Sequence, residues 1–454
     1  MSTRNNAMLS KGAVRLLGRQ FLKGIETRME EGYFLEAKRL DGFLKQLNVI
    51  SCEQKYSNGY NQTIYFNNTD HEVPFGLSVR ARGYAPAQTG KQFRPDFQKE
   101  WKFEVKKSTH NLSRKREKFF AHIPLVDIIK KLNKRPPLLY FVPAKPLMPH
   151  VAATYQRAHY YVKNNERFRV TIDRDVRYYV FETSRTAVRI GSEDRTVRVE
   201  LKFDVALLDS KLYRRVIKIL HAHGAEQLLS KKQAAYDAEY QLLKRKYKKW
   251  LENSDTEIES KLSLPVNKQY IFTQLKHDFR KGKLKAFRIA KGCEDSWEHT
   301  NFARYVIAGD GSYIRLTHNG KKVVYKSNEV IARNRFGLGC ILQRREIAKR
   351  APQALLQKPY FLRLRTRKTF IVEHIITKDL YILLIDHVAA GGKDLYQLEV
   401  ENISFSPSES KREKIVNDIA CITQYIIKRY KLRPTRMTKL DWVKKVATVQ
   451  TMHL

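Results

Sequence analysis

Charged and apolar side chains alternate along several short stretches of this chain. Glu100, Lys102, Glu104 and Lys106 are separated from one another by single apolar residues. In a β-strand, successive side chains point to opposite faces, so these four charges share one face and the apolar groups share the other. Taken together, Arg and Lys outnumber the acids on such faces, but Glu and Asp recur among them. The same alternation occurs at residues 167–175, 197–203 and 363–367.

This mixture of side chains suits the binding of a polyphosphate chain together with a divalent metal ion. Arginine offers forked donors that bind phosphate oxygens in pairs, and lysine adds adjustable point charges. Mg²⁺ and Mn²⁺ require hard oxygen ligands, which carboxylates supply. If the strands close into a barrel, the charged faces would line its lumen. A solvated face of an open antiparallel sheet is the alternative for each single strand.

The composition indicates a globular protein with polyanionic partners. The chain has 454 residues with 87 Lys and Arg against 46 Asp and Glu, which gives a formal net charge of +41. A hydrophobic fraction of 42% excludes a disordered polycation. The charge raises the local concentration of polyanions. It does not choose among nucleic acid, polyphosphate, nucleotides and anionic membranes.

The cysteines and the apolar stretches predict a cytoplasmic protein. Cys52, Cys293, Cys340 and Cys421 are far apart and include no C-x-x-C pair, so neither a disulfide framework nor a zinc site is expected. The first residues contain no apolar core of a signal peptide. No stretch approaches the roughly 20 apolar residues of a membrane-spanning helix.

The order of expected strands and helices divides the chain into five segments. We expect a basic N-terminal lead-in at residues 1–24, a strand-rich domain at 25–230 and a charged helical linker at 231–265. A second strand-rich domain is expected at 266–432, followed by a basic C-terminal tail at 433–454. The expected fold class is α+β, with tandem antiparallel β-barrel domains and flanking helices.

Landmarks of the first strand-rich domain recur in the same order in the second. This preserved order predicts a diverged duplication, whereas chance similarity among basic strands is the alternative. The matched features are Arg80 with Arg315, residues 100–106 with 322–326, residues 115–117 with 344–346, residues 171–173 with 384–386, and residues 199–202 with 398–401.

A series of short segments in the first domain resembles one known family. They are Arg28-x-Glu30 followed by Tyr33, and residues 63–67, 79–82, 103–106, 114–116, 155–157, 168–173, 200–202 and 229–231. In this order they resemble the vacuolar transporter chaperone (VTC) domain, the polyphosphate-polymerase branch of the CYTH-like triphosphate tunnel superfamily. The resemblance covers about residues 28–236, and residues 300–402 look like a second, more distant copy.

The resemblance implies an antiparallel triphosphate tunnel of about eight strands and a set of site residues. Glu200 would hold Mn²⁺ or Mg²⁺, assisted by Glu30 and Glu104, and Lys231 would lie at the tunnel mouth. Lys106, Arg157, Arg169 and Lys231 would be the catalytic residues. The implied phosphate contacts are Arg80, Arg82, Lys106, Lys115, Arg116, Arg157, Arg169 and Lys202.

Two departures from the family pattern bear on activity. The first strand of the family reads Arg-x-Glu-x-Lys-Tyr, but Gly32 stands here at the lysine position. In the second copy we expect the opening strand near residues 285–291, which contain no acidic pair, whereas Glu399 and Glu401 are better preserved. The second copy is then either a degenerate scaffold or the working site. In the latter case Arg315, Lys326, Arg363, Arg365 and Arg367 would surround Glu399 and Glu401.

These observations predict metal-dependent phosphoryl transfer on a polyphosphate or a triphosphate. The reaction would be either extension of polyphosphate from a nucleoside triphosphate or hydrolysis of a terminal phosphate. Positioning and charge neutralisation carry most of the catalysis of such reactions. The alternative is a non-catalytic binder of polyanions, including nucleic acid, built on degenerate tunnels with salt-dependent phosphate contacts.

Overall fold

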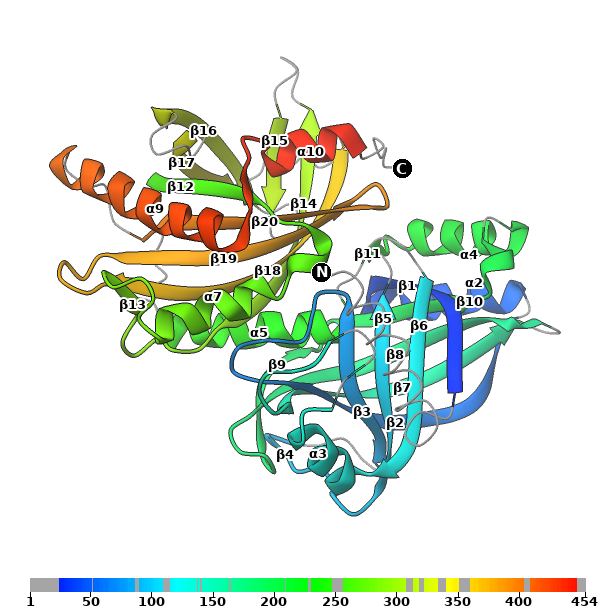
Figure 1. Ribbon diagram of the computed structural model, residues 1–454. Helices are drawn as coiled ribbons and strands as arrows, with labels where there is room; N and C mark the ends of the chain where they lie inside the picture. The colour runs from blue at the N-terminus through cyan, green and yellow to red at the C-terminus, as the bar shows by residue number, and fades with distance from the viewer. Residues whose placement is uncertain are drawn as a thin grey trace. The chain divides into compact units, whose positions relative to one another are not determined.

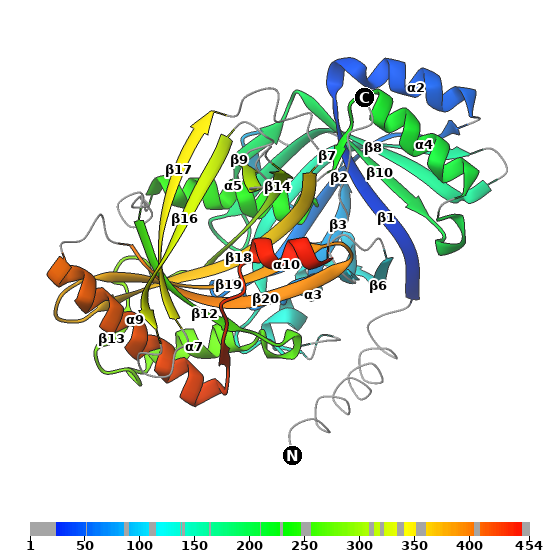
Figure 2. The same cartoon turned by 90° about the horizontal axis from the view of Figure 1, so that it is seen from above.

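The computed structural model divides the chain into two compact units (Figures 1 and 2). The first unit comprises residues 1–68 and 72–239, and the second comprises residues 69–71 and 240–454. Each unit is built on one large antiparallel sheet. The residues that the structure describes are 24–50, 52–85, 90–108, 115–136, 138, 141–162, 165–208, 210–227, 230–246, 256–307, 313–317, 322–333, 340–350, 360–403 and 409–446.

The sheet of the first unit closes on itself. Eight of its strands form a ring in the order β10-β1-β6-β5-β3-β2-β7-β8, and β8 pairs in turn with β10. Short strands β4 (Gln92–Phe93), β9 (Ala187–Glu193) and β11 (Glu226–Gln227) extend the sheet beyond the ring. The ring strands are β1 (Gly24–Glu36), β2 (Cys52–Asn67), β3 (Leu77–Ala85), β5 (Glu100–Ser108), β6 (Lys115–Pro124), β7 (Met148–Val162), β8 (Asn165–Phe181) and β10 (Thr196–Phe203).

The alternation along these strands separates an apolar outside from a polar lumen. Trp101 and Phe103 on β5 pack outward in a core shared with α3 (Leu125–Asn133). On another side, Val199 and Leu201 on β10 pack in a core shared with α2 (Leu40–Val49) and α4 (Lys211–Ala222). Because neighbouring residues of a strand point to opposite faces, the charged residues between these apolar ones face the lumen.

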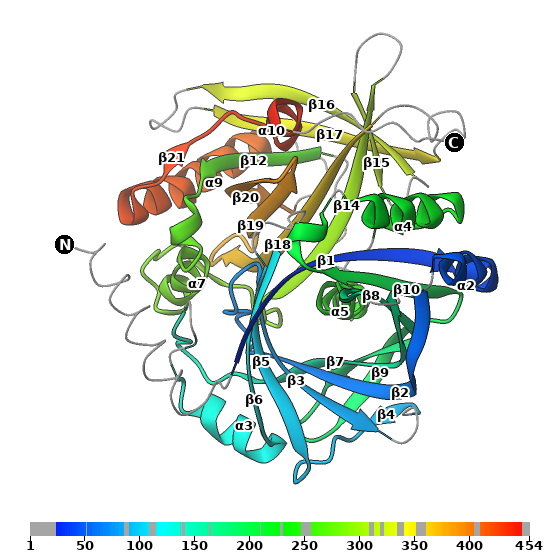
Figure 3. The same ribbon diagram turned by 90° about the vertical axis from the view of Figure 1, so that its right-hand side faces the viewer.

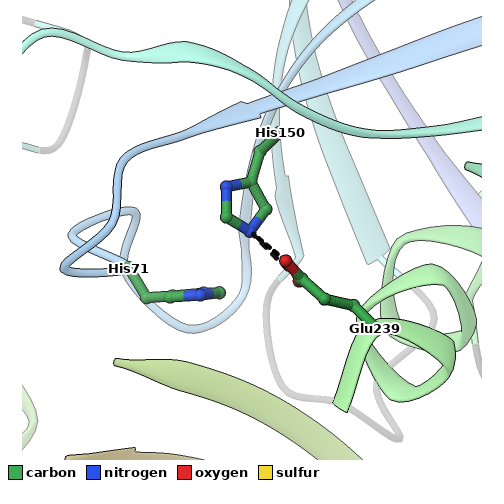
Figure 4. A group of neighbouring side chains, drawn as sticks. All are labelled: His71, His150 and Glu239. Carbon is green, nitrogen blue, oxygen red and sulfur yellow. Dashed lines mark hydrogen bonds and ion pairs between the residues drawn. The ribbon is translucent and has the colours of Figure 1, made fainter. Parts of the chain in front are cut away.

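Helix α5 (Lys231–Lys246) fills one end of this lumen (Figure 3). Its Ala235 and Tyr236 are fully buried. The Tyr236 hydroxyl accepts a hydrogen bond from Asn67 Nδ2 at 3.1 Å, and His150 Nε2 on β7 lies 3.1 Å from the Glu239 carboxylate (Figure 4). The helix is therefore fixed to the barrel wall by apolar and polar contacts. The strand residues that pack with Ala235 and Tyr236 are Tyr65, Val151, Ala153, Tyr155, Val176 and Tyr178.

The second unit repeats this ring. Its strands follow the order β20-β12-β17-β16-β15-β14-β18-β19, and β19 pairs with β20 to close the ring. Position by position, this is the strand order of the first unit, so the expectation of tandem antiparallel barrels is confirmed. The strands are β12 (Thr256–Ser263), β14 (Trp297–Ile307), β15 (Tyr313–Thr317), β16 (Lys322–Arg333), β17 (Cys340–Arg350), β18 (Tyr360–His374), β19 (Leu380–Ala390) and β20 (Lys393–Asn402), with short β13 (Phe287–Ile289) and β21 (Arg433–Pro434) outside the ring.

Helices α7, α9 and α10 accompany the second ring. Helix α9 (Glu409–Tyr430) lies along its outside, where the Thr423 and Ser260 hydroxyls are 2.6 Å apart. Helix α7 (Ile271–Arg280) packs Phe272 against Phe370 of β18. Helix α10 (Lys439–Val446) packs Trp442 and Val443 into one end of the lumen. Within the described part of the chain, no helix has the length and apolar character needed to cross a membrane.

The structure places two segments differently from the expected domain boundaries. Residues 231–265 are not a continuous linker, because α5 enters the first barrel and residues 256–263 form β12 of the second. Similarly, α10 lies within the expected C-terminal tail but packs into the second barrel. In these segments Lys231, Glu259 and Lys261 are buried, whereas Arg245, Lys444 and Lys445 are exposed.

Candidate functional sites in the two lumens

Four charged side chains form a buried cluster in the first lumen. Arg157 on β7 donates hydrogen bonds to both carboxylate oxygens of Asp173 on β8, at 2.6 and 2.7 Å. Its Nη2 also lies 3.2 Å from Glu200 Oε2 on β10. Lys231, the first residue of α5, donates to Glu200 Oε1 at 2.6 Å and forms an ion pair with Asp173. The cluster therefore links three strands and the helix that fills the lumen.

Glu200 is neutralised by its neighbours. A third cation, Lys202, lies 2.7 Å from Glu200 Oε2. Burial by itself would raise the pKa of Glu200, but the charges of Lys202, Lys231 and Arg157 outweigh burial and hold the pKa well below its ordinary value. Glu200 is thus ionised at neutral pH, and both of its oxygens contact protein cations.

Other charged side chains of the first lumen form separate pairs. Arg80 Nε and Arg82 Nη2 on β3 donate to Glu104 Oε2 on β5, at 2.6 and 3.0 Å. Burial of the Arg80 guanidinium is offset by the Glu104 carboxylate, so the pKa of Arg80 rises above its ordinary value. Lys106 pairs with Glu30. The Arg169 guanidinium donates to the Tyr161 hydroxyl at 3.1 Å.

The second lumen contains the same four-residue cluster. Arg367 on β18 donates to both oxygens of Asp386 on β19, at 2.7 and 2.8 Å, and its Nη2 lies 3.2 Å from Glu399 Oε2 on β20. Lys439, the first residue of α10, lies 2.6 Å from Asp386 Oδ2 and 2.7 Å from Glu399 Oε1. In each barrel, the lysine comes from the first residue of the helix that enters the lumen.

The strand registers show which residues occupy equivalent positions in the two barrels. Glu200 pairs across the ladder with Gly32, and Glu399 pairs with Lys261. One step along, Lys202 pairs with Glu30, and Glu401 pairs with Glu259. Lys261 therefore occupies the position of Gly32, and Glu401 that of Lys202. By the same register, Glu257 occupies the position of Arg28.

These exchanges give the second lumen a group of carboxylates. Ligand oxygens of Glu259, Glu399 and Glu401 all lie within 4.8 Å of one another. Burial and the carboxylates of Glu257, Glu399 and Glu259 raise the pKa of Glu401 to about 8, against the lowering effect of Arg367. Lys261 Nζ lies 3.0 Å from Glu259 Oε2 and is also paired with Glu399. The neighbouring cations therefore do not fully offset the repulsion among these carboxylates.

A row of arginines along β18 lies in the same lumen. Arg363, Arg365 and Arg367 point to one face of the strand at successive alternate positions. Arg363 Nη1 donates to the Tyr305 hydroxyl at 3.0 Å. Burial, together with the charges of Arg367, Arg363 and Arg315, lowers the pKa of Arg365 to about 9. The Nε atoms of Arg363 and Arg365 are buried without a hydrogen-bond partner, so this part of the lumen favours an anion.

The two lumens differ in their fit to a divalent metal ion. In the second, Glu259, Glu399 and Glu401 supply converging hard oxygen donors of the kind that Mg²⁺ and Mn²⁺ prefer. In the first, the described carboxylates Glu30, Glu104 and Glu200 form no such converging group. The second lumen therefore has three converging carboxylates for a metal ion, which would share Glu399 with Lys261, Lys439 and Arg367. The first lumen has no such group among its described residues.

The expected site residues fall into three groups. The structure brings Arg157, Lys202, Glu200 and Lys231 into one cluster. It places Arg80, Arg82 and Glu104 in the same lumen, and pairs Lys106 with Glu30. It does not gather Glu30 and Glu104 around Glu200 as a metal site, because Glu30 pairs with Lys106 and Glu104 with Arg80, and the three carboxylates do not converge. The side chains of Lys115, Arg116 and Lys326 lie outside the described residues.

One sequence expectation is wrong in a way that matters for function. The opening strand of the second barrel is β12, not residues 285–291, and it carries Glu257, Glu259 and Lys261 at alternate positions. Alternation of these charges with buried Ile258, Ser260 and Leu262 was the available signal. Lys439 was also missed, and no local pattern in the sequence identifies it.

Comparison with known proteins gives a family for the first barrel. Residues 30–244 match the family described as the VTC domain. The matched segment is slightly less than half of the chain. The match ends within α5, and the second barrel lies outside it. No curated protein matches the chain.

Each of three similar solved structures covers less than half of this chain. A protein of Vibrio parahaemolyticus described as a candidate adenylate cyclase is 14% identical, with a TM-score of 0.29, covering 46% of this chain and 97% of its own. The mimivirus RNA triphosphatase domain is 14% identical, with a TM-score of 0.25, covering 40% and 96%. The Schizosaccharomyces pombe RNA triphosphatase is 14% identical, with a TM-score of 0.26, covering 45% and 94%.

Proposed function

We propose that this protein is a metal-dependent phosphoryl-transfer enzyme acting on a polyphosphate or a triphosphate, with its reaction centre in the second barrel. The observation that carries the proposal is the convergence of Glu259, Glu399 and Glu401 within 4.8 Å beside the arginine row of β18. A lumen with carboxylates alone would hold a metal ion but repel the substrate, and one with arginines alone would lack a metal site. The VTC domain in the same chain supports this class of chemistry.

The residues of the second lumen divide the work between metal and phosphate. Glu259, Glu399 and Glu401 would hold Mg²⁺ or Mn²⁺, which when bound neutralises phosphate charge and polarises a phosphoryl oxygen. Arg363 and Arg365, whose Nε atoms have no internal partner, would bind phosphate groups further along the substrate. Phosphoryl transfer requires mainly this positioning and charge neutralisation.

The packing of α10 favours hydrolysis of a terminal phosphate over chain extension. Trp442 and Val443 pack into the lumen beside Arg363, against apolar residues that share its end of the barrel. A lengthening product would need an exit along the lumen, and this end is filled. A short triphosphate needs none. The residues that contact Trp442 and Val443 are Tyr305, Phe361, Val388 and Leu395.

The test is release of inorganic phosphate from tripolyphosphate and from nucleoside triphosphates, measured with Mg²⁺, with Mn²⁺ and with EDTA. We expect release only with metal, and a loss on the order of 100-fold in Glu399→Gln. Glu200→Gln, the equivalent change in the first barrel, should retain turnover within about threefold. Thermal unfolding of both variants verifies that they are folded.

Two results would contradict the proposal. One is that Glu200→Gln loses turnover while Glu399→Gln retains it, which would move the chemistry to the first barrel. The other is absence of turnover with every substrate and metal while nucleic acid binds in a salt-dependent way. That second result would favour the non-catalytic polyanion binder.

A further inference from the structure

We infer that the second unit carries a membrane-docking tip, which inserts two isoleucines into the surface of an anionic bilayer. The tip is the turn between β18 and β19, residues 374–379, and its apolar part is Ile375 and Ile376. The inference concerns the outside of the barrel and stands whether or not its lumen is catalytic.

Two adjacent isoleucines are exposed at the tip. Ile376 is 82% exposed and Ile375 is 38% exposed. Among the described residues, Ile376 is the most exposed of the large hydrophobic side chains. Single exposed apolar residues are common on protein surfaces. Two neighbouring isoleucines at a turn, where glycine and polar residues prevail, indicate a surface that gains free energy when another apolar phase covers it.

Hydrogen bonds fix the backbone of the tip. The His374 amide donates to the Asp379 carbonyl at 2.8 Å, and the Lys378 amide donates to the His374 carbonyl at 2.9 Å. The Ile375 amide donates to the Ala286 carbonyl at 2.8 Å, which ties the tip to the connection between α7 and β13. The isoleucines are therefore held outward before any partner binds, so little further ordering entropy is lost on contact.

Lysines from three neighbouring segments surround the isoleucines. The α7–β13 connection lies beside the tip through the Ala286 contact, and the start of α9 lies beside it because Lys414 Nζ is 2.7 Å from Asp379 Oδ2. The acids that pair with these lysines, Asp278 and Asp379, are largely buried, so the surface itself is basic. The exposed or half-exposed lysines are Lys281, Lys283, Lys285, Lys378, Lys411 and Lys414.

This combination favours a bilayer over the other polyanions that the net charge of +41 allows. Anionic lipids attract lysines near their surface, and the adjoining acyl region accepts apolar side chains. The backbone phosphates of a nucleic acid would contact the lysines but would not bury the isoleucines. A protein partner would need a hollow shaped to receive a projecting side chain. The deformable interface of a bilayer needs none.

The experiment is co-sedimentation of the full chain with phosphatidylcholine vesicles, with and without phosphatidylserine, at physiological salt. We expect the wild type to bind the vesicles that contain phosphatidylserine. Ile375→Ser/Ile376→Ser should lower the affinity about tenfold without a change in net charge, because the apolar insertion is lost. Lys281→Gln/Lys285→Gln should lower it about tenfold as well, because two contacts with anionic lipid are lost.

Matched variants separate the tip from the general basic charge of the chain. Val266→Ser removes another exposed apolar side chain, and Lys130→Gln/Lys134→Gln removes the same charge from exposed positions on or next to α3. Both should bind within about twofold of the wild type, since charges away from the contact are screened by salt. Thermal unfolding of each variant verifies that it is folded.

A variant with a reporter shows whether the tip enters the lipid. Ile376→Trp should bind at least as tightly as the wild type, because tryptophan favours the membrane interface. Lipids brominated in their acyl chains should quench the fluorescence of the introduced tryptophan. The inference is overturned if Ile375→Ser/Ile376→Ser binds as the wild type does, which would leave charge alone as the cause of binding. It is also overturned if the brominated lipids do not quench the introduced tryptophan, or if the wild type binds neither kind of vesicle.

Discussion

The two barrels share a scaffold and an inner ion cluster but differ in the residues that could hold a metal. Both rings have the same strand order, and both contain an arginine, an aspartate, a glutamate and a helix-borne lysine in the same contacts. The difference is confined to a few register positions, among them Gly32 against Lys261 and Lys202 against Glu401. The inner cluster is therefore compatible with either lumen chemistry.

The shared cluster stabilises the fold, because it joins strands that are distant in sequence to the helix in the lumen. Its aspartates are fully buried in both barrels: Asp173 and Asp386 have no exposed surface. The glutamates differ, because the Glu200 side chain is 24% exposed and that of Glu399 is 1% exposed. The first lumen is thus more open to water at this point than the second.

The largest expected effect is a loss of stability on breaking the shared cluster. Asp173→Asn and Asp386→Asn should each lower the free energy of unfolding of their barrel by about 3–5 kcal/mol, because each leaves a buried arginine and lysine undercompensated. Urea unfolding measures this. The exposed Asp295→Asn is the control, with a change of less than about 0.5 kcal/mol. A large loss in only one of the two barrels would show that the clusters are not equivalent.

The next effect concerns Lys261, which has Gly32 at the equivalent position of the first barrel. Lys261→Met should lower metal-dependent phosphate release by about 100-fold, because Lys261 contacts both Glu259 and Glu399. The reciprocal change, Gly32→Lys, should not create turnover in a Glu399→Gln background, since the first lumen would still have Lys202 where the second has Glu401. Turnover restored by Gly32→Lys would place a reaction centre in the first barrel and contradict this prediction.

A third prediction sets stability against binding. The Arg365 side chain is only 14% exposed, and burial and neighbouring arginines lower its pKa to about 9, whereas the equivalent position of the first barrel is Tyr155. Arg365→Gln should therefore raise the free energy of unfolding by about 1 kcal/mol. The same change should raise KM for tripolyphosphate by about tenfold. Unfolding and steady-state kinetics on one preparation measure both, and a destabilised variant would contradict the prediction.

The smallest expected effect is a difference in acid sensitivity. His159 has a folded-state pKa of about 3 and an unfolded-state pKa of about 6.5. Below pH 6.5 the unfolded state binds a proton at this histidine and the folded state does not, so the free energy of unfolding falls as pH falls. Between pH 6.5 and 5, the wild type should lose about 2 °C more in Tm than His159→Gln. Parallel curves would indicate that no positive field acts on this histidine.

Much of the first barrel could be predicted from sequence because its signal is local. A period of two along a strand determines which side chains share a face, and this predicted that Arg169 shares a face with Asp173, and Glu200 with Lys202. Arg157 came from the family resemblance. The same logic gave the repeated order of landmarks that the second ring bears out. Closure of the ring, which turns those faces into a lumen, follows from the pairing of β8 with β10.

The parts that sequence missed depend on contacts between distant segments. Thr256–Ser263 follows a polar stretch, so its charges suggested a linker until pairing with β20 placed Glu259 and Lys261 opposite Glu401 and Glu399. Lys439 reaches Asp386 only because α10 enters the lumen. Likewise, the partners of Arg157 are set by cross-strand register and by α5. No periodic pattern in the sequence indicates any of these contacts.

The pairing of the first strand of each ring with a late one has a consequence for how the protein is made. Met29 on β1 pairs with Phe203 on β10, and Glu259 on β12 pairs with Glu401 on β20. Contacts so distant along the chain form slowly, because the entropy cost of closing the long intervening loop comes before the contacts stabilise the structure. On the ribosome, each sheet must wait with an open edge until its closing strand emerges, and the first can close while the second is still being translated.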